Sequence, residues 1–167
     1  MAVVWGPRSA FGLVLALAVF AADRANKIWF LDGLDLAQRG RVEVTPFFDL
    51  VLVWNRGISY GLFPQDSDLG RWGLVLFAVA ASIGLALWLA RTIGDATPAA
   101  LGLIIGGALG NALDRVLYGA VADFYSLHAF GFYWYVFNLA DVAIVAGVAL
   151  LLYLSLATSH KSAEKPR

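Results

Sequence analysis

The chain has 167 residues, of which 60% are hydrophobic and only 14% are charged. This composition excludes an ordinary soluble domain and a disordered chain, and the formal charge of zero gives no electrostatic basis for nucleic-acid binding. The absence of cysteine excludes disulfides, thiolate metal sites and a cysteine nucleophile. The sequence therefore predicts a small membrane protein with few polar side chains.

The first apolar run, residues 9–22, is short for a membrane span and is followed by Asp23 and Lys27. It fits either a cleaved signal peptide or a helix that continues to residue 31, and the apolar residues after Lys27 favour the helix. Asp23 and Lys27 then lie on one helix face, at the spacing of a stabilising acid–base pair. We expect a retained first span over residues 9–31.

The segment after the first span has the pattern of a small β-sheet. Arg41–Thr45 alternates apolar and polar residues, as a half-buried strand does, and residues 47–54 are rich in β-branched and aromatic side chains. Residues 55–57 are a turn signal, after which residues 58–63 are expected to form a returning strand. We expect this sheet over residues 38–65, against one face of the membrane.

Three further charge-free runs approach the length of about 20 residues that crosses the hydrocarbon core. They predict spans over residues 70–91, 96–116 and 138–158. An aromatic-rich loop or short helix, 117–137, would join the last two spans, and a disordered polar tail, 159–167, would follow. The expected fold class is an α-helical integral membrane protein, with four transmembrane helices and a small β-sheet in a single domain.

Four spans place both termini on the same side of the membrane. The numbers of Lys and Arg on the two sides do not say which side this is. Within the third span, Gly102, Gly106 and Gly110 recur every four residues, which predicts a close approach of neighbouring helices.

Polar side chains gather at the adjoining ends of the third and fourth spans. They are Asn111, Arg115, Asp123, Asn138 and Asp141. Because a short connection joins the two spans, we expect these ends to converge on one site. Two carboxyl groups in a partly dry site would share one proton, which is the state that aspartic proteolysis uses.

Other interpretations of the same acids remain open at this point. Asp114 and Arg115 fit a charge pair at a helix end, Asp123 fits a turn, and Asp141 fits the first turn of a helix. The acids also fit a proton or ion relay through a helix bundle. Finally, Asp114, Asp123 and Asp141 fit the oxygen ligands of a metal-dependent hydrolase.

Several sequence blocks resemble the signature blocks of one family, lipoprotein signal peptidase (signal peptidase II). In chain order they are residues 23–27 (DRANK), 55–61 (NRGISYG), 106–115 (GGALGNALDR), 119–124 (GAVADF) and 137–141 (FNLAD). The resemblance extends over residues 23–144. Two positions depart from the family pattern, because Arg24 stands where Gln is usual and Ser59–Tyr60 stand where Ala-Phe is usual.

The resemblance implies an aspartic endopeptidase of the bacterial inner (plasma) membrane, with cytoplasmic termini and an active site facing the extracytoplasmic side. Its substrate would be a diacylglyceryl-modified prolipoprotein, cut just before the lipidated lipobox cysteine. Asp123 and Asp141 match the catalytic pair. The other matching positions would orient the substrate or support the site: Asp23, Lys27, Asn55, Gly107, Asn111, Arg115, Asn138 and Ala140.

The resemblance also sets the expected partners. Besides the prolipoprotein, these are membrane lipids and inhibitors of the globomycin type. We expect no metal or other cofactor, no nucleic acid and a monomeric chain.

Overall fold

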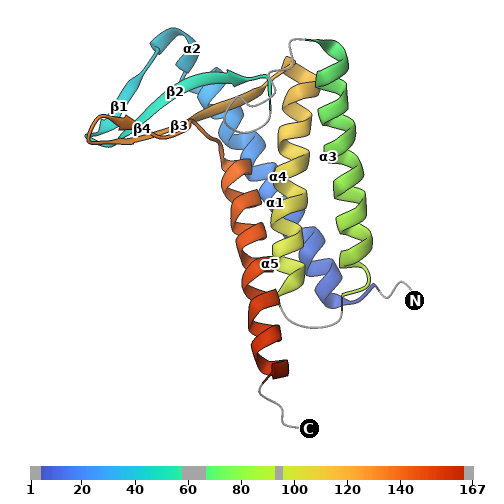
Figure 1. Ribbon diagram of the computed structural model, residues 1–167. Helices are drawn as coiled ribbons and strands as arrows, with labels where there is room; N and C mark the ends of the chain where they lie inside the picture. Colours follow the sequence, from blue (N-terminus) through green and yellow to red (C-terminus); the bar gives the residue numbers. More distant parts are fainter. Residues whose placement is uncertain (1–4, 58–66, 93–95, 164–167) are drawn as a thin grey trace.

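The computed structural model describes residues 5–57, 67–92 and 96–163. Within these residues, four helices are long and apolar enough to cross a membrane. They belong to α1 (Pro7–Ile28), α3 (Asp68–Leu89), α4 (Thr97–Tyr118) and α5 (Leu139–Ala163), shown in Figure 1. Together with a small antiparallel sheet, they confirm the predicted fold class.

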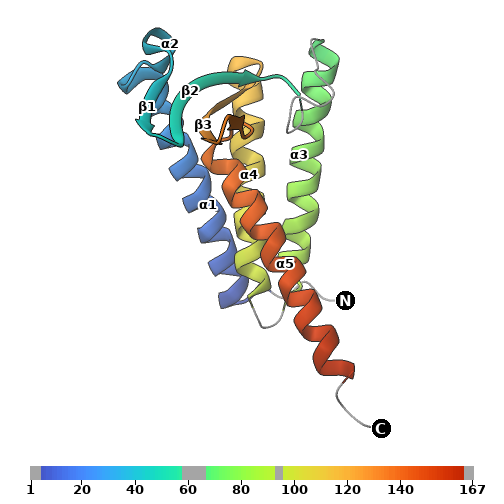
Figure 2. The same ribbon diagram turned by 60° about the vertical axis from the view of Figure 1, so that its left-hand side comes forward.

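Helix α4 lies at the centre of the bundle, because α1, α3 and α5 all pack against it. Its surface is largely buried, whereas the other three long helices leave most of theirs exposed. Successive long helices run in opposite directions, so the first turn of α1 and the last turn of α5 lie at the end opposite the sheet (Figures 1 and 2).

The close approach that the glycine spacing predicted is present on two faces of α4. A Cβ atom on Gly102 or Gly106 would collide with the backbone of α1. On a neighbouring face, a Cβ on Gly107 would lie 2.5 Å from the carbonyl oxygen of Ala140, in α5. These glycines therefore let α4 touch two neighbouring helices backbone to backbone.

Helix α1 continues through Asp23 and Lys27, as the longer interpretation of the first span predicted. It leads into a π-helical turn, η1 (Trp29–Gly33), in which the N–H of Leu34 donates to the Trp29 carbonyl at 2.7 Å. The short helix α2 (Leu36–Arg39) then carries the chain to the sheet.

The sheet has the strand order β1–β2–β3–β4, with antiparallel neighbours (Figure 2). Its strands are β1 (Val42–Thr45), β2 (Phe48–Asn55), β3 (Val121–Ala129) and β4 (Phe132–Tyr133). The first two strands were predicted. The returning strand expected at residues 58–63 lies outside the described residues, as do Ser59 and Tyr60.

Strand β3 corrects the assignment of residues 117–137 to a loop or short helix. Its first four residues are all buried, and Ala122 and Phe124 pack with Phe30 and Leu36 in the core beside the sheet. A strand covered on both faces lacks the apolar–polar alternation by which a half-buried strand is recognised.

Two smaller differences concern β1 and α5. Val44 is exposed, so β1 is not the half-buried strand that its alternation indicated. The apolar span of α5 ends at Ala157, close to the expected residue 158, but the helix continues to Ala163, so residues 159–163 of the tail expected to be disordered are helical. No proline or glycine interrupts the sequence between these two points, so nothing local stops the helix there.

Candidate active site

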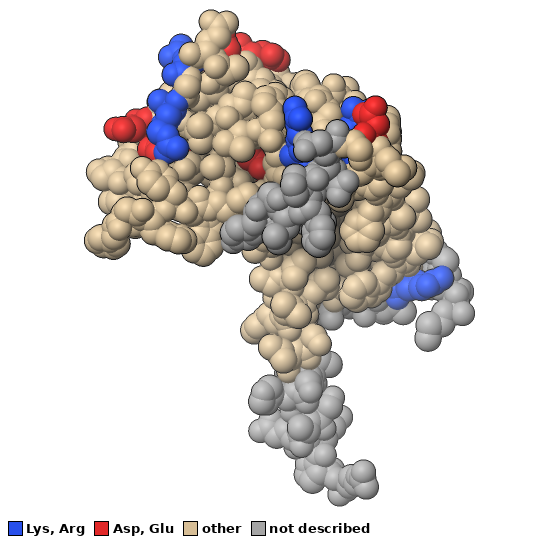
Figure 3. Space-filling model, turned by 45° about the horizontal axis from the view of Figure 1, so that its top comes forward, with Lys and Arg blue, Asp and Glu red and all other residues tan. Residues whose placement is uncertain are grey.

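The two candidate acids meet at the end of the bundle that carries the sheet. Asp123 lies on β3 with its side chain buried, and Asp141 lies in the first turn of α5, where it is partly exposed. Figure 3 shows that charged side chains gather at this end of the molecule, while much of the visible helix surface carries none.

Asn138 joins the two acids. Its Nδ2 donates to Oδ1 of Asp123 at 2.6 Å, and its Oδ1 accepts the backbone N–H of Asp141 at 2.9 Å. Its own backbone N–H donates to Oδ2 of Asp141 at 3.2 Å. Asn138 and Asp141 therefore form a reciprocal capping box, so the sequence that begins α5 also fixes Asp141 and aims Asn138 at Asp123.

Asn111 of α4 holds the other oxygen of Asp141. Its Nδ2 donates to Asp141 Oδ1 at 2.8 Å, and its Oδ1 accepts from Asn138 Nδ2 and from Lys27 Nζ, each at 3.1 Å. Both oxygens of Asp141 therefore face hydrogen-bond donors, an arrangement that suits an ionised carboxylate.

Strand β2 supplies the side chains on the far side of Asp123. The register pairs Asn55 with Val121, two residues from Asp123 on β3. Asn55 Nδ2 donates to Asp123 Oδ2 at 3.2 Å and also to the Tyr135 hydroxyl, which lies 3.5 Å from the same oxygen. Tyr135 lies in the aromatic-rich segment 117–137 and was not predicted to belong to the site, because only the fold of the sheet brings it beside Asp123.

Burial and the neighbouring Asp141 carboxylate raise the pKa of Asp123 to about 7. Asn138 and Asn55 act in the opposite direction, because their hydrogen bonds favour the ionised form, but they do not outweigh the burial. Asp123 therefore keeps a proton to a higher pH than an ordinary carboxyl group does.

The charges around the pair agree with one retained proton. The region contains four carboxyl groups and three basic groups: Asp23, Asp114, Asp123 and Asp141 against Arg24, Lys27 and Arg115. Full ionisation would leave one uncompensated negative charge in a largely dry region, which is costly. A single proton shared by the two acids removes this imbalance.

A buried ion cluster lies behind the two acids. Lys27 Nζ is 2.8 Å from Asp23 Oδ2 and 2.7 Å from Asp114 Oδ2, and all three side chains are almost fully buried. Arg24 adds a second cation, 2.7 Å from Asp114 Oδ1. Asp114 therefore pairs with Lys27 and Arg24, and the interpretation that paired it with Arg115 does not hold. Adjacent residues point to different faces of a helix.

Each carboxylate of this cluster also holds the backbone beside one candidate acid. Asp114 accepts the N–H of Ala122 at 3.2 Å, and Asp23 accepts the N–H of Ala140 at 3.0 Å. These alanines directly precede the two acids of the pair in the sequence. The structure thus brings Asp23, Lys27 and Ala140 together behind the two acids, and Ala122 is an addition that the sequence did not suggest.

Arg115 contacts the turn after β2 instead of Asp114. Its Nη2 donates to the carbonyl of Gly57 at 2.7 Å, and its Nη1 donates to the carbonyl of Asn111 at 3.2 Å. The N–H of Gly57 in turn donates to Asn55 Oδ1 at 3.0 Å. Arg115 therefore holds the turn that keeps Asn55 beside Asp123.

Two largely apolar cavities open beside Asp141. One, of about 360 Å³, lies among α3, α4 and α5, and Asn55, Asn111 and Arg115 reach its wall. The other, of about 390 Å³, runs along α5 beside Trp134. Asp141 lines both cavities, so it is exposed to apolar space on two sides.

The arrangement does not match the metal-site alternative. In the part of the chain that the structure describes, no three His, Cys, Asp or Glu side chains are grouped as ligands of one metal ion. Asp114 is instead occupied by Arg24 and Lys27. His128 lies 3.1 Å from Asp49, which belongs to a separate cluster in the sheet.

The model of the family described as Signal peptidase (SPase) II matches residues 15–157. The chain belongs to the signal peptidase II family. This is a family of aspartic peptidases, so the chain is a multi-pass membrane peptidase.

Curated relatives match most of the chain. Proteins named lipoprotein signal peptidase from Methylorubrum extorquens (strain PA1) and Nitrobacter hamburgensis are each 54% identical to it. The alignments cover 87% and 85% of this chain, and 85% and 89% of the relatives. A solved structure described as a bacterial membrane enzyme has a TM-score of 0.79 at 26% identity, and the match covers 95% of this chain and 94% of that one.

Proposed function

We propose that this signal peptidase II family member removes signal peptides from diacylglyceryl-modified prolipoproteins, and that Asp123 and Asp141 are its catalytic pair. One observation carries the assignment of the pair. Asn138 binds both carboxyl groups, one on β3 and one on α5. The names of the relatives supply the substrate class.

The two acids have different roles in this proposal. Asp123, whose pKa of about 7 lets it keep a proton, donates a hydrogen bond to the carbonyl oxygen of the scissile peptide. Asp141, whose two oxygens accept from Asn111 and from the N–H of Asn138, takes a proton from the attacking water. The water oxygen bonds to the carbonyl carbon, and as the C–N bond breaks the proton on Asp141 passes to the leaving amine, which returns the pair to its singly protonated state.

The lipid on the substrate explains why the pair lies beside apolar cavities. A diacylglyceryl group carries two acyl chains that lose free energy if they leave hydrocarbon for water. A precursor that approaches from the bilayer keeps these chains in apolar surroundings while its peptide bond reaches Asp141. The cavities among α3–α5 and along α5 lie where such a substrate would have to enter.

The membrane orientation is a part of the same proposal. We place the chain in the bacterial inner membrane, with both termini in the cytoplasm and with the sheet and the acid pair on the extracytoplasmic side. The acids lie at the opposite end of the bundle from the first turn of α1 and the last turn of α5. The family resemblance supports a cytoplasmic placement of the end that holds the first turn of α1 and the last turn of α5.

The substrate claim is tested by comparing two forms of one precursor. Purified protein is given the diacylglyceryl-modified prolipoprotein or the same polypeptide without the lipid, and mass spectrometry identifies the products. We expect cleavage of the lipidated form, with the lipidated cysteine as the new N-terminal residue. Equal cleavage of both forms, or a cut elsewhere, would contradict the proposal.

A further inference from the structure

The hydroxyl group of Tyr135 lies beside the acid pair and has no part in the mechanism proposed above. Tyr135 stands in the segment that joins β4 to α5 and is partly buried. Its oxygen accepts from Asn55 Nδ2 at 2.5 Å and lies 3.5 Å from Oδ2 of Asp123. Tyr135 also lines the cavity along α5 that reaches Asp141. The hydroxyl is therefore within reach of the acid that binds the substrate carbonyl.

The hydrogen bonds of Asn55 fix the direction of its amide group. Its Oδ1 accepts the N–H of Gly57 at 3.0 Å, so its Nδ2 faces the other way. Nδ2 carries two hydrogens and has two acceptors, which are Asp123 Oδ2 at 3.2 Å and the Tyr135 hydroxyl at 2.5 Å. Tyr135 thus takes one N–H of Asn55 and leaves the other for Asp123.

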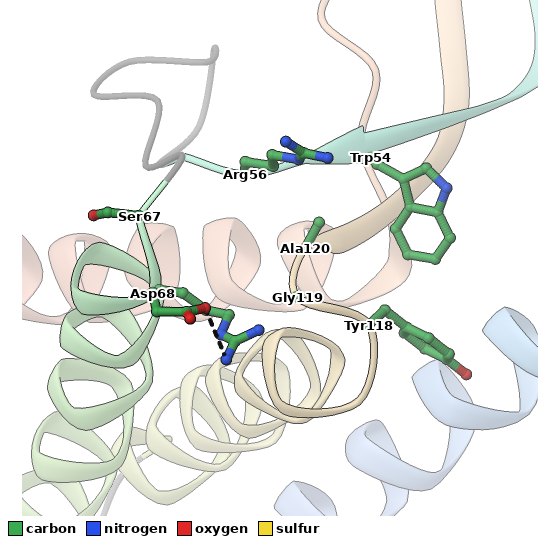
Figure 4. A pocket seen from close by; sticks show the side chains of 8 residues that line it. Trp54, Arg56, Ser67, Asp68, Tyr118, Gly119 and Ala120 are labelled. Atoms are coloured by element: carbon green, nitrogen blue, oxygen red, sulfur yellow. Dashed lines mark ion pairs between the residues drawn. The ribbon is translucent and has the colours of Figure 1, made fainter.

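The end of β2 that carries Asn55 has a separate support on its other face. Side chains alternate along a strand, so Trp54 points away from the direction of Asn55. The ring of Trp54 lies 5.4 Å from that of Tyr118, and Figure 4 shows both on one side of a neighbouring cavity. Loss of the Tyr135 hydroxyl should therefore change the direction of the Asn55 amide and leave the strand in place.

A tyrosine hydroxyl differs chemically from the amide partners of Asp123. The amide nitrogens of Asn55 and Asn138 only donate, whereas a hydroxyl both donates and accepts. Tyr135 can therefore accept from Asp123 while the acid is protonated, and can donate to Oδ2 when the acid gains negative charge. The distance of 3.5 Å is long for a hydrogen bond, but such contacts in an active site often shorten once substrate is bound.

We propose that Tyr135 is a positioning residue of the peptidase reaction, which orients the Asn55 amide and stabilises Asp123 as this acid shares its proton with the substrate carbonyl. The inference rests on the proposed function, in which Asp123 binds the carbonyl oxygen. As that oxygen gains negative charge, the Asp123 proton moves toward it and the Asp123 carboxyl group becomes more negative. The Tyr135 hydroxyl then donates to Oδ2 and keeps its own proton. A charge-assisted hydrogen bond is stronger than a neutral one, so this contact favours the transition state over the bound substrate.

The kinetic test compares Tyr135→Phe with Tyr133→Phe. The first variant loses the hydroxyl beside Asp123 and keeps the ring, whereas the second loses the hydroxyl of an exposed tyrosine on β4. We expect Tyr135→Phe to lower kcat for the lipidated precursor about tenfold with KM unchanged, and Tyr133→Phe to leave both unchanged. A kcat equal to that of the wild type in Tyr135→Phe, or a loss confined to KM, would overturn the proposal.

A double substitution tests whether Tyr135 acts through Asn55. Adding Tyr135→Phe to Asn55→Ala should lower kcat by less than about threefold more, because the amide that the hydroxyl orients is already absent. A further fall as large as that seen in the wild-type background would show that the two residues act independently, which contradicts this role of Tyr135.

A spectroscopic titration makes the test independent of peptidase activity. The infrared band that disappears in Asp123→Asn identifies the protonated Asp123 carboxyl group, and its pH dependence gives the pKa of that group. We expect the midpoint to rise by about half a pH unit in Tyr135→Phe, because a donor that favours the ionised form is removed, and to stay fixed in Tyr133→Phe. An unchanged or lower midpoint in Tyr135→Phe would overturn the proposal. A wild type that cleaves no precursor would contradict the proposed function, and the infrared midpoint would still decide the role of Tyr135.

Discussion

Asp123 is buried on a strand and lies beside a second carboxyl group, and both conditions disfavour its charge. Its pKa of about 7 stands above the ordinary value of 3.8. The folded protein therefore binds this proton more tightly than the unfolded chain does. The contribution of this group to stability is fully present below pH 3.8 and is lost as the pH rises through about 7. This group therefore makes the folded protein less stable near neutral pH than it is in acid, and this loss of stability accompanies the raised pKa of Asp123.

Activity should follow the same proton. We expect kcat/KM to fall as the pH rises above about 7, where Asp123 loses its proton. In Asn55→Ala the pKa of Asp123 should rise, because a donor that favours the ionised form is removed, and the alkaline limb should move up by about one pH unit. The pH profile of precursor cleavage checks this shift.

The control for this prediction is Gln38→Ala, which removes an exposed side-chain amide of α2 and should leave the limb in place. An alkaline limb that stays fixed or moves to lower pH in Asn55→Ala would contradict the account of Asp123.

The helices and strands position the pair through backbone contacts as much as through side chains. Helix α4 touches α5 where Gly107 faces Ala140, the residue before Asp141. On the other side, the Asp23 carboxylate fixes the N–H of the same alanine. The start of α5 is therefore held between α1 and α4. Because Ala140 directly precedes Asp141, a shift of the Ala140 backbone also moves the Asp141 carboxyl group.

Gly107→Ala should separate α4 from α5, because the new Cβ would lie 2.5 Å from the Ala140 carbonyl oxygen. We expect a loss of about 1–3 kcal/mol of stability and a fall in kcat. Thermal unfolding and precursor cleavage measure the two effects.

Gly84→Ala is the matched control, because its Cβ would meet nothing within 4 Å in the middle of α3. It should be neutral or stabilising by about 1 kcal/mol through helix propensity. Equal effects of the two substitutions would show that the contact between Gly107 and Ala140 does not matter.

The sequence predicted this level of structure unevenly. The helices follow from charge-free runs, and the acids could be assigned because their blocks resemble a known family. Strand β3 could not be recognised, because burial on both faces removes the alternation that marks a strand. Tyr135 was missed because it joins the site only through the fold of the sheet. Ala122 was missed because it acts through its backbone N–H, a group that every residue except proline has.

Over the whole molecule, the polar and charged features described above gather at one end of the bundle. The sheet, the acid pair and the ion cluster around Lys27 share one end of the bundle, and the last turn of α3 and the first turn of α4 lie at the other. This asymmetry gives the bundle a chemically active face and agrees with a substrate that meets the enzyme at one membrane surface.

The proposed orientation can be read with single cysteines, because the chain has none of its own. Gln38→Cys places a thiol on α2 beside the sheet, and Arg91→Cys places one in the turn after α3, both at exposed positions. In spheroplasts, a membrane-impermeant maleimide should label Gln38→Cys and should reach Arg91→Cys only after the membrane is opened. The reverse pattern would place the active site in the cytoplasm.

Cleavage of diacylglyceryl-prolipoprotein by Asp123→Asn and Asp141→Asn tests the catalytic pair most directly. Asp49→Asn serves as the control, because Asp49 is also buried in the sheet but binds Arg41 and His128. We expect each of the first two variants to insert, fold and lose at least about a hundredfold in rate, while Asp49→Asn still cleaves. Full activity in folded Asp123→Asn or Asp141→Asn would contradict the assignment of these two acids as the catalytic pair.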